Sequence, residues 1–140
     1  MEKALKPLIV TAIFVSGLVA YFIPYIKMEF SGSAHYTEQN KREYNFYTPA
    51  ILKTMPRITS EYDFDFANIT GPASQVYAIR FYHTNDPSEI NKYLQKNGFI
   101  QQKECHIQAV CWQRGNASET VTISTLDKPI ALLVSVIYKF

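Results

Sequence analysis

The sequence predicts an α+β protein in which an N-terminal transmembrane helix precedes a small domain. Three observations predict this class. Residues 7–26 are uncharged and apolar, period-2 alternation recurs along several later segments, and one amphipathic stretch interrupts them. We expect four or five strands in a mainly antiparallel sheet, with one or two helices on one face. At 140 residues, the chain has room for one such domain beyond the apolar segment.

The segment PLIVTAIFVSGLVAYFIPYI, residues 7–26, is expected to cross a membrane. About 20 helical residues span a hydrocarbon core of about 30 Å. The nearest candidate cleavage sites carry a bulky residue at position −3, so we expect an anchor rather than a removed signal peptide. Lys3 and Lys6 indicate that the N-terminus, residues 1–6, lies in the cytoplasm. The domain would then be extracytoplasmic. In a bacterium, the helix would lie in the inner membrane and the domain in the periplasm. A reversed anchor with a cytoplasmic domain is the alternative.

Residues 27–46 are expected to form a polar stalk, and residues 47–140 the folded domain. The lead-in SGSAHYTEQNKREYN has no usable period. A short helix should follow in TPAILKTMP, where Thr48 can cap the helix and Pro56 should stop it.

The stretch ITSEYDFDFANI, residues 58–69, is expected to be a strand with one buried and one wet face. Aromatic and acidic side chains alternate along it: Tyr62, Phe64 and Phe66 against Glu61, Asp63 and Asp65. A turn and a second strand over residues 75–84 should follow.

The stretch NDPSEINKYLQKNGF predicts the best helix of the domain, over residues 87–97. Asp86 can cap it and Gly98 can end it in the left-handed conformation. Further strands are expected at residues 99–102, 109–114, 119–126 and 130–140. The last should lie inside the sheet, because its even positions are all apolar.

The acidic side chains Glu61, Asp63 and Asp65 are the first candidate site. They would lie about 6–7 Å apart on one strand face. That spacing suits a hard cation or an acid–base pair, but an ordinary solvated face has the same pattern. We favour a docking surface for a basic partner and expect no metal or cofactor.

Aromatic residues suggest a second binding surface. The chain holds 10 Tyr, 9 Phe and one Trp, more than one sheet face and one helix need. The cluster Tyr44, Phe46 and Tyr47 is the strongest candidate for a protein-binding patch. The alternative is that such residues cover the second sheet face.

Catalytic motifs give little support to an enzyme. His35, His83 and His106 lack the spacing of a zinc pair, and neither a nucleophile elbow nor a phosphate loop occurs. A small envelope hydrolase that uses the acidic strand and His83 is the alternative. Asn68 and Asn116 match a glycosylation pattern, but we interpret both as turn residues.

Cys105 and Cys111 are expected to form a disulfide. Their spacing fits neither a redox motif nor a closed zinc site. On a straight strand their Cα atoms would lie about 20 Å apart, whereas a disulfide needs less than about 7 Å. The segment HIQAV between them must therefore bend.

Together these features predict a membrane-anchored extracytoplasmic module that binds a protein. It would be an accessory subunit of an envelope complex or an inhibitor, such as an immunity protein against an extracytoplasmic toxin. Another alternative is a subunit whose transmembrane helix docks in a larger complex through Ser16 and Gly17. The formal charge of +2 and the lack of a basic run do not favour nucleic-acid binding.

Overall fold

The structure is a computed structural model that describes residues 2–115 and 118–140. The chain divides between Ser31 and Gly32 into two compact units. The first contains one helix, α1 (Glu2–Glu29), and the second contains the sheet. Asn116 lies outside the described residues.

Helix α1 is the apolar element predicted from the sequence. Within the described part of the chain, Leu5–Glu29 is the one helix long and apolar enough to cross a membrane, by length and composition. It continues through Pro24 to Glu29, so the proline does not end it. The expected span, residues 7–26, therefore lies entirely within α1 and is long enough to cross a hydrocarbon core as a helix.

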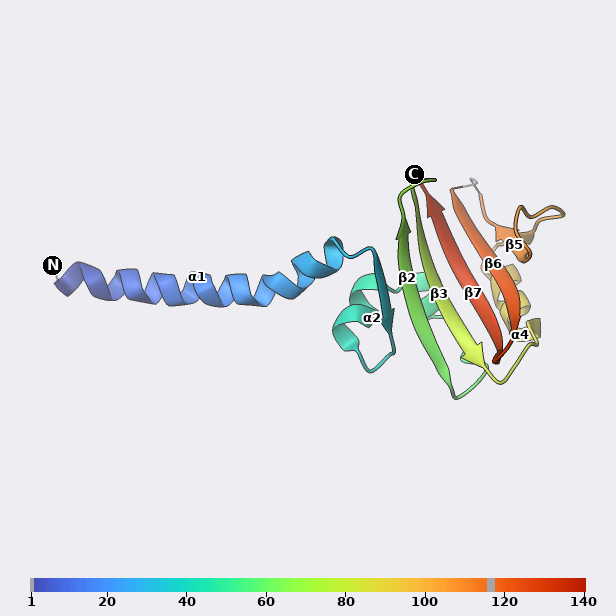
Figure 1. Ribbon diagram of the computed structural model, residues 1–140, viewed down its shortest axis with the longest axis horizontal. Coiled ribbons are helices and arrows are strands. Elements are labelled where there is room, and N and C mark those ends of the chain that lie inside the picture. The colour runs from blue at the N-terminus through green and yellow to red at the C-terminus, as the bar shows by residue number, and fades with distance from the viewer. Residues whose placement is uncertain (1, 116–117) are drawn as a thin grey trace. The chain divides into compact units, whose positions relative to one another are not determined.

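The second unit contains a seven-stranded sheet rather than one of four or five (Figure 1). All neighbours are antiparallel, as expected, in the order β1-β2-β3-β7-β6-β5-β4. The strands are β1 (Ser33–Tyr36), β2 (Tyr62–Ile69), β3 (Ser74–Tyr82), β4 (Ile100–Gln101), β5 (Val110–Gln113), β6 (Glu119–Asp127) and β7 (Ile130–Lys139). Six of these strands correspond to expected segments, including residues 99–102 for β4. The additional strand is β1, which is short and depends on its pairing with β2 rather than on local sequence.

Strand β7 occupies the centre of the sheet, between β3 and β6, which confirms its predicted interior position. Two tight hairpins, β2–β3 and β6–β7, set most of the register. Ile69 faces Ser74 at the first turn, and Asp127 faces Ile130 at the second. Asn68 belongs to β2 and pairs with Gln75, so it is a strand residue rather than the predicted turn residue.

Helices α2 (Lys41–Tyr47), α3 (Ala50–Lys53) and α4 (Ser88–Lys96) cover one face of the sheet (Figure 1). Tyr47 stacks on Phe66 of β2, and the Tyr93 hydroxyl of α4 donates to the Ile51 carbonyl of α3 at 2.8 Å. The side chains between these helices and the sheet are fully buried and include Leu52, Phe64, Ile79, Phe81, Ile90, Leu94, Val121 and Val134. Burial of this apolar surface is the main stabilising term.

The predicted stalk over residues 27–46 requires a correction, because β1 and most of α2 lie within it. Tyr36 is 2 % exposed and stacks on Tyr47 and Phe64. Its hydroxyl lies 3.0 Å from the Thr48 hydroxyl. These contacts join residues distant in sequence, so a polar segment without period becomes an ordered edge of the sheet. Thr48 is accordingly the C-cap of α2, while Pro49 precedes α3.

The helix predicted over residues 87–97 is α4. The Asp86 carboxylate accepts a hydrogen bond from the Ser88 amide at 3.0 Å, which satisfies a free donor at the helix start. Gly98 ends the helix with φ of +82°, the left-handed conformation that glycine adopts without strain.

Candidate functional site

The face of the sheet opposite α2, α3 and α4 carries the candidate site, and we call it the open face. Side chains two residues apart on a strand share a face, so Asp63 and Asp65 point here while Phe64 points to the helices. Register continues the row from Asp65 through Ala78 and Ser135 to Thr122. Along this row the open face changes from a charged residue on β2 to small and hydroxyl-bearing residues on β3, β7 and β6.

A charged cluster joins β1, β2 and β3 on this face. His35 lies directly opposite Asp65, with 2.7 Å between Nδ1 and Oδ1. The Arg80 guanidinium lies 3.1 Å from Asp65 and 3.6 Å from Asp63. The Tyr82 hydroxyl donates to Asp63 Oδ2 at 2.6 Å. We name His35, Asp63, Asp65, Arg80 and Tyr82 the charged cluster.

Electrostatics within the charged cluster favour the charged form of Arg80 beside the carboxylates of Asp63 and Asp65. The hydrogen bond with Tyr82 and the nearby carboxylates raise the pKa of Arg80 against the effect of its partial burial. The hydrogen bond to Asp63 raises the pKa of Tyr82. Two carboxylates against one guanidinium leave about one negative charge while His35 is neutral.

Among the described residues, His35, Asp63 and Asp65 form a group that could hold a metal ion, because their ligand atoms lie within 4.8 Å of one another. Arg80 opposes this function, since its guanidinium lies beside both carboxylates and would repel a cation. Asp63 is only 9 % exposed, and its Oδ1 atom lacks a hydrogen-bond donor although Arg80 is near. The geometry describes an ion-pair network in which one guanidinium serves two carboxylates.

Glu61 lies apart from the other two acidic residues. Its carboxylate is 2.7 Å from His83 Nε2, and both side chains are exposed. The structure thus separates the three histidines: His35 joins the charged cluster, His83 pairs with Glu61, and His106 lies on a loop after β4. The hydrolase alternative invoked His83, but the histidine beside Asp63 and Asp65 is His35.

The predicted aromatic patch is divided between surface and core. Tyr47 is buried, and Tyr44 packs edge-on against Phe64. Phe46 is the exposed member, at 38 %. Tyr44 also accepts a hydrogen bond from Arg57, whose guanidinium lies over the Phe64 ring. The alternative interpretation of these aromatics, cover for a sheet face, describes Tyr44 and Tyr47.

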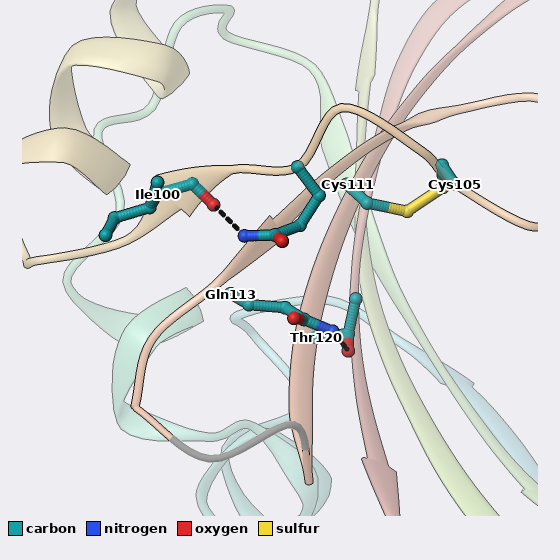
Figure 2. The surroundings of a disulfide bond; sticks show 6 residues. Ile100, Cys105, Cys111, Gln113 and Thr120 are labelled. Atoms are coloured by element: carbon teal, nitrogen blue, oxygen red, sulfur yellow. Dashed lines mark hydrogen bonds between the residues drawn. A yellow bond between two sulfur atoms is a disulfide. The ribbon is translucent and has the colours of Figure 1, made fainter.

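Cys105 and Cys111 form the predicted disulfide (Figure 2). Their Cα atoms are 5.6 Å apart, so the intervening segment bends as the geometry requires. Cys111 belongs to β5, and Figure 2 shows Cys105 on the loop that precedes this strand. The Gln102 amide donates to the Cys111 carbonyl at 2.8 Å. The disulfide loop, residues 102–109, is thereby tied to the open face.

A pocket of about 440 Å³ lies between the disulfide loop and the sheet. The loop forms one wall, and the tip of the β2–β3 hairpin and the end of β7 form the other. The floor comes from β3, β5 and β6 and includes Ser74, Cys111, Thr120 and Thr122, all at most 9 % exposed. Its volume falls in the range typical of binding pockets.

Comparison with known proteins adds no functional assignment. No protein-family model, curated protein or solved structure matches this chain. The site must therefore be interpreted from its own geometry.

Sequence reasoning missed Arg80, Tyr82 and His35 as partners of the acidic strand. A signal for the first two was present, because a tight turn after Ile69 sets a hairpin register in which Asp63 faces Arg80. No comparable signal existed for His35, whose strand lies in a polar segment. The pocket was also missed, because its lining comes from five strands and two of the segments that connect strands.

Proposed function

We propose that this protein is a membrane-anchored, extracytoplasmic module that binds a protein partner through the open face of its sheet. One observation carries the proposal: the pocket on this face lies beside exposed apolar side chains. Ile69 is 40 % exposed and Ile107 is 54 % exposed, and both line the pocket. Exposed apolar surface next to a preformed pocket is typical of protein interfaces.

The compartment is proposed from two further features. Helix α1 has the length and composition of a membrane span, and disulfides persist mainly in oxidising compartments. An anchor with a cytoplasmic N-terminus would place the sheet outside the cytoplasm. Confinement to the membrane surface raises the effective concentration toward a partner there.

Two roles fit such a module, an accessory subunit of an envelope complex and an inhibitor of the immunity-protein kind. The charged cluster would supply orientation in either role, since charged groups at an interface set specificity and encounter rate. Glu61 and its partner His83 are exposed, whereas Phe46 is exposed on α2, on the helix-covered side of the sheet. Tyr44 and Tyr47 would act only indirectly, because they support β2 from the helix-covered side.

Crosslinking in intact cells, followed by affinity purification of the full chain from solubilised membranes, tests the proposal. Ser135→Arg places a long cation in the centre of the open face, where Ser135 is flanked by Ala78 and Thr122. Gln95→Arg makes a matched change on the exposed side of α4. We expect a specific partner with the wild type and Gln95→Arg, and its loss with Ser135→Arg.

Equal recovery of the partner by both variants would show that the open face is not the interface. Recovery of no specific partner by the wild type would contradict the binding function itself. Near-UV circular dichroism of each variant verifies that the sheet is intact. The identity of the partner then separates the two roles, because a toxin and a complex subunit are different proteins.

A further inference from the structure

We propose that the pocket takes one bulky apolar side chain from an extended segment of the partner, and that the Cys105–Cys111 disulfide keeps the pocket formed. This inference rests on the proposed function and specifies its chemistry. It also concerns a different part of the open face from the charged cluster, whose polar groups are already paired with one another.

The lining of the pocket selects an apolar occupant with a few hydrogen-bonding groups. Val76 and Ile137 form an apolar pair on neighbouring strands, facing each other in register. Hydroxyls of Thr120 and Thr122 lie on the adjacent strand, and the Gln113 amide donates to the Thr120 hydroxyl at 3.3 Å. Apolar walls with few polar groups are the usual composition of a pocket that holds one organic group.

The rim indicates a peptide segment rather than a free small molecule. Ile69 and Ile107 extend the apolar surface beyond the pocket on two sides, from the hairpin tip and from the loop. A molecule confined to the pocket would leave this apolar surface exposed to water, whereas a peptide segment that passes over the pocket would cover both Ile69 and Ile107. Glu104, His106 and Lys139 place groups of both signs on the rim, which suits peptide dipoles better than a single ionic head.

The disulfide determines whether the pocket has its outer wall. Among the described residues of the loop, the Ala109 amide bonds back to Ile107 within the loop itself. Residues 104–107 form the wall of the pocket, and the disulfide from Cys105 to Cys111 connects them to the sheet. Reduction would leave a loop whose conformation no local turn signal specifies. The pocket would then lose the surface that faces Val76 and Ile137.

Methyl NMR of the full chain in lipid nanodiscs gives a direct test with capped amino acids as probes. N-acetyl-tryptophanamide and N-acetyl-leucinamide carry an apolar side chain between two peptide groups, and N-acetyl-asparaginamide is the polar control. We expect saturable shifts for the methyls of Ile69, Ile107 and Ile137, which line the pocket. The buried methyls of Ile79 and Ile90 on the helix-covered face should stay in place.

Two matched pairs of variants locate the binding. Thr122→Phe fills the floor, whereas Ser124→Phe makes a similar change on the same strand and face outside the pocket. Ile107→Asp alters the exposed rim without touching the core, and Ile100→Asp is its exposed counterpart on β4. We expect affinity for the apolar probes to fall at least about tenfold in Thr122→Phe and Ile107→Asp, and to remain within about twofold in the controls. Reduction with dithiothreitol should weaken binding as strongly as Thr122→Phe does.

The results separate this inference from the proposed function. Absence of saturable shifts, or equal affinity in each matched pair, would overturn the inference that the pocket binds an apolar side chain. Unchanged binding after reduction would overturn the role of the disulfide. If the wild type and Thr122→Phe capture the same partner equally, the binding function stands and the pocket is not its anchor. If the probes bind as expected but no partner is captured, the pocket stands and the proposed function fails.

Discussion

Arg80 has two carboxylate neighbours, and one of them, Asp63, is nearly buried. A carboxylate in that position loses hydration and depends on the guanidinium and on the Tyr82 hydroxyl for compensation. Sequence alternation assigned Asp63 to a wet face. Its low exposure arises because neighbouring strands surround it with longer side chains.

Replacement of Arg80 by methionine is predicted to destabilise the domain by about 1–3 kcal/mol. The change keeps an unbranched apolar side chain but removes the guanidinium, which leaves Asp63 without its cation. Urea unfolding of the full chain measures the effect. Glu61→Gln, in the exposed pair with His83, is the control and should change the unfolding free energy by less than about 0.5 kcal/mol. Equal effects of the two substitutions would contradict the role of Arg80.

Glu38 is predicted to make stability depend on acid pH. Burial acts to raise the pKa of Glu38, but hydrogen bonds from Arg57 and Tyr62 together with the Arg57 charge outweigh it, so the pKa lies below its usual value. The carboxylate therefore stabilises the fold above the unfolded pKa of about 4.3, and this contribution is lost as pH falls through the lower folded pKa. Urea unfolding across this range should show wild type and Glu38→Gln differing at pH 6 and converging at low pH. Glu89→Gln, on the exposed side of α4, should show no such convergence.

Among the elements, β1 and α2 show how tertiary contacts order a segment with no period of its own. The tyrosine stack of Tyr36, Tyr47 and Phe66 fixes both elements against β2. Tyr36 comes from the polar lead-in, Tyr47 comes from the end of α2, and Phe66 comes from β2. The stack forms because β2 presents Phe66 on the same face as α2.

Tyr36→Ala is predicted to lower the unfolding free energy by about 3–5 kcal/mol, as for other buried aromatic truncations. It would leave a cavity between α2 and β2 and remove the contact with the Thr48 hydroxyl. Phe46→Ala, next to this stack but exposed, should cost much less. A loss below about 1 kcal/mol for Tyr36→Ala would indicate that residues 33–36 behave as a stalk after all.

Reduction of the disulfide is predicted to lower stability by about 2 kcal/mol, the chain-entropy value for so short a loop. The main sheet should survive, because β6, β7 and β3 pair over their whole length without help from the loop. Hydrogen exchange should increase in residues 103–109 and change little in β7. A Cys105→Ser, Cys111→Ser variant should show the same exchange with and without dithiothreitol. Increased exchange throughout the sheet would contradict a local role.

At the scale of the whole molecule, we propose that α1 localises the protein to the membrane and that the sheet binds the partner. Replacement of residues 1–31 by an unrelated single-span anchor of the same orientation should leave partner capture unchanged. The two compact units divide at this position, so the exchange keeps the second unit whole. Carbonate extraction would verify that the chimera stays in the membrane. Loss of capture would support the alternative in which α1 itself docks, through the surface that carries Ser16 and Gly17.

The sequence by itself determined the elements whose signals are local. Hydropathy located α1, alternation located β2, β6 and β7, aromatic and aliphatic composition located β3, and capping residues located α4. The cysteine spacing required a bend between Cys105 and Cys111. These features follow from side-chain period, backbone preference and bond geometry, which act over a few neighbouring residues.

Only the tertiary structure decided which strands close the sheet and which polar groups meet. The edge strand β1 exists because its longer neighbour β2 offers it hydrogen bonds. His35 reaches Asp65 from a position 30 residues away, and the pocket draws its lining from segments between Ile69 and Lys139. Such contacts depend on register and sheet order, which are set by the sum of many packing and hydrogen-bond terms rather than by any one stretch of sequence.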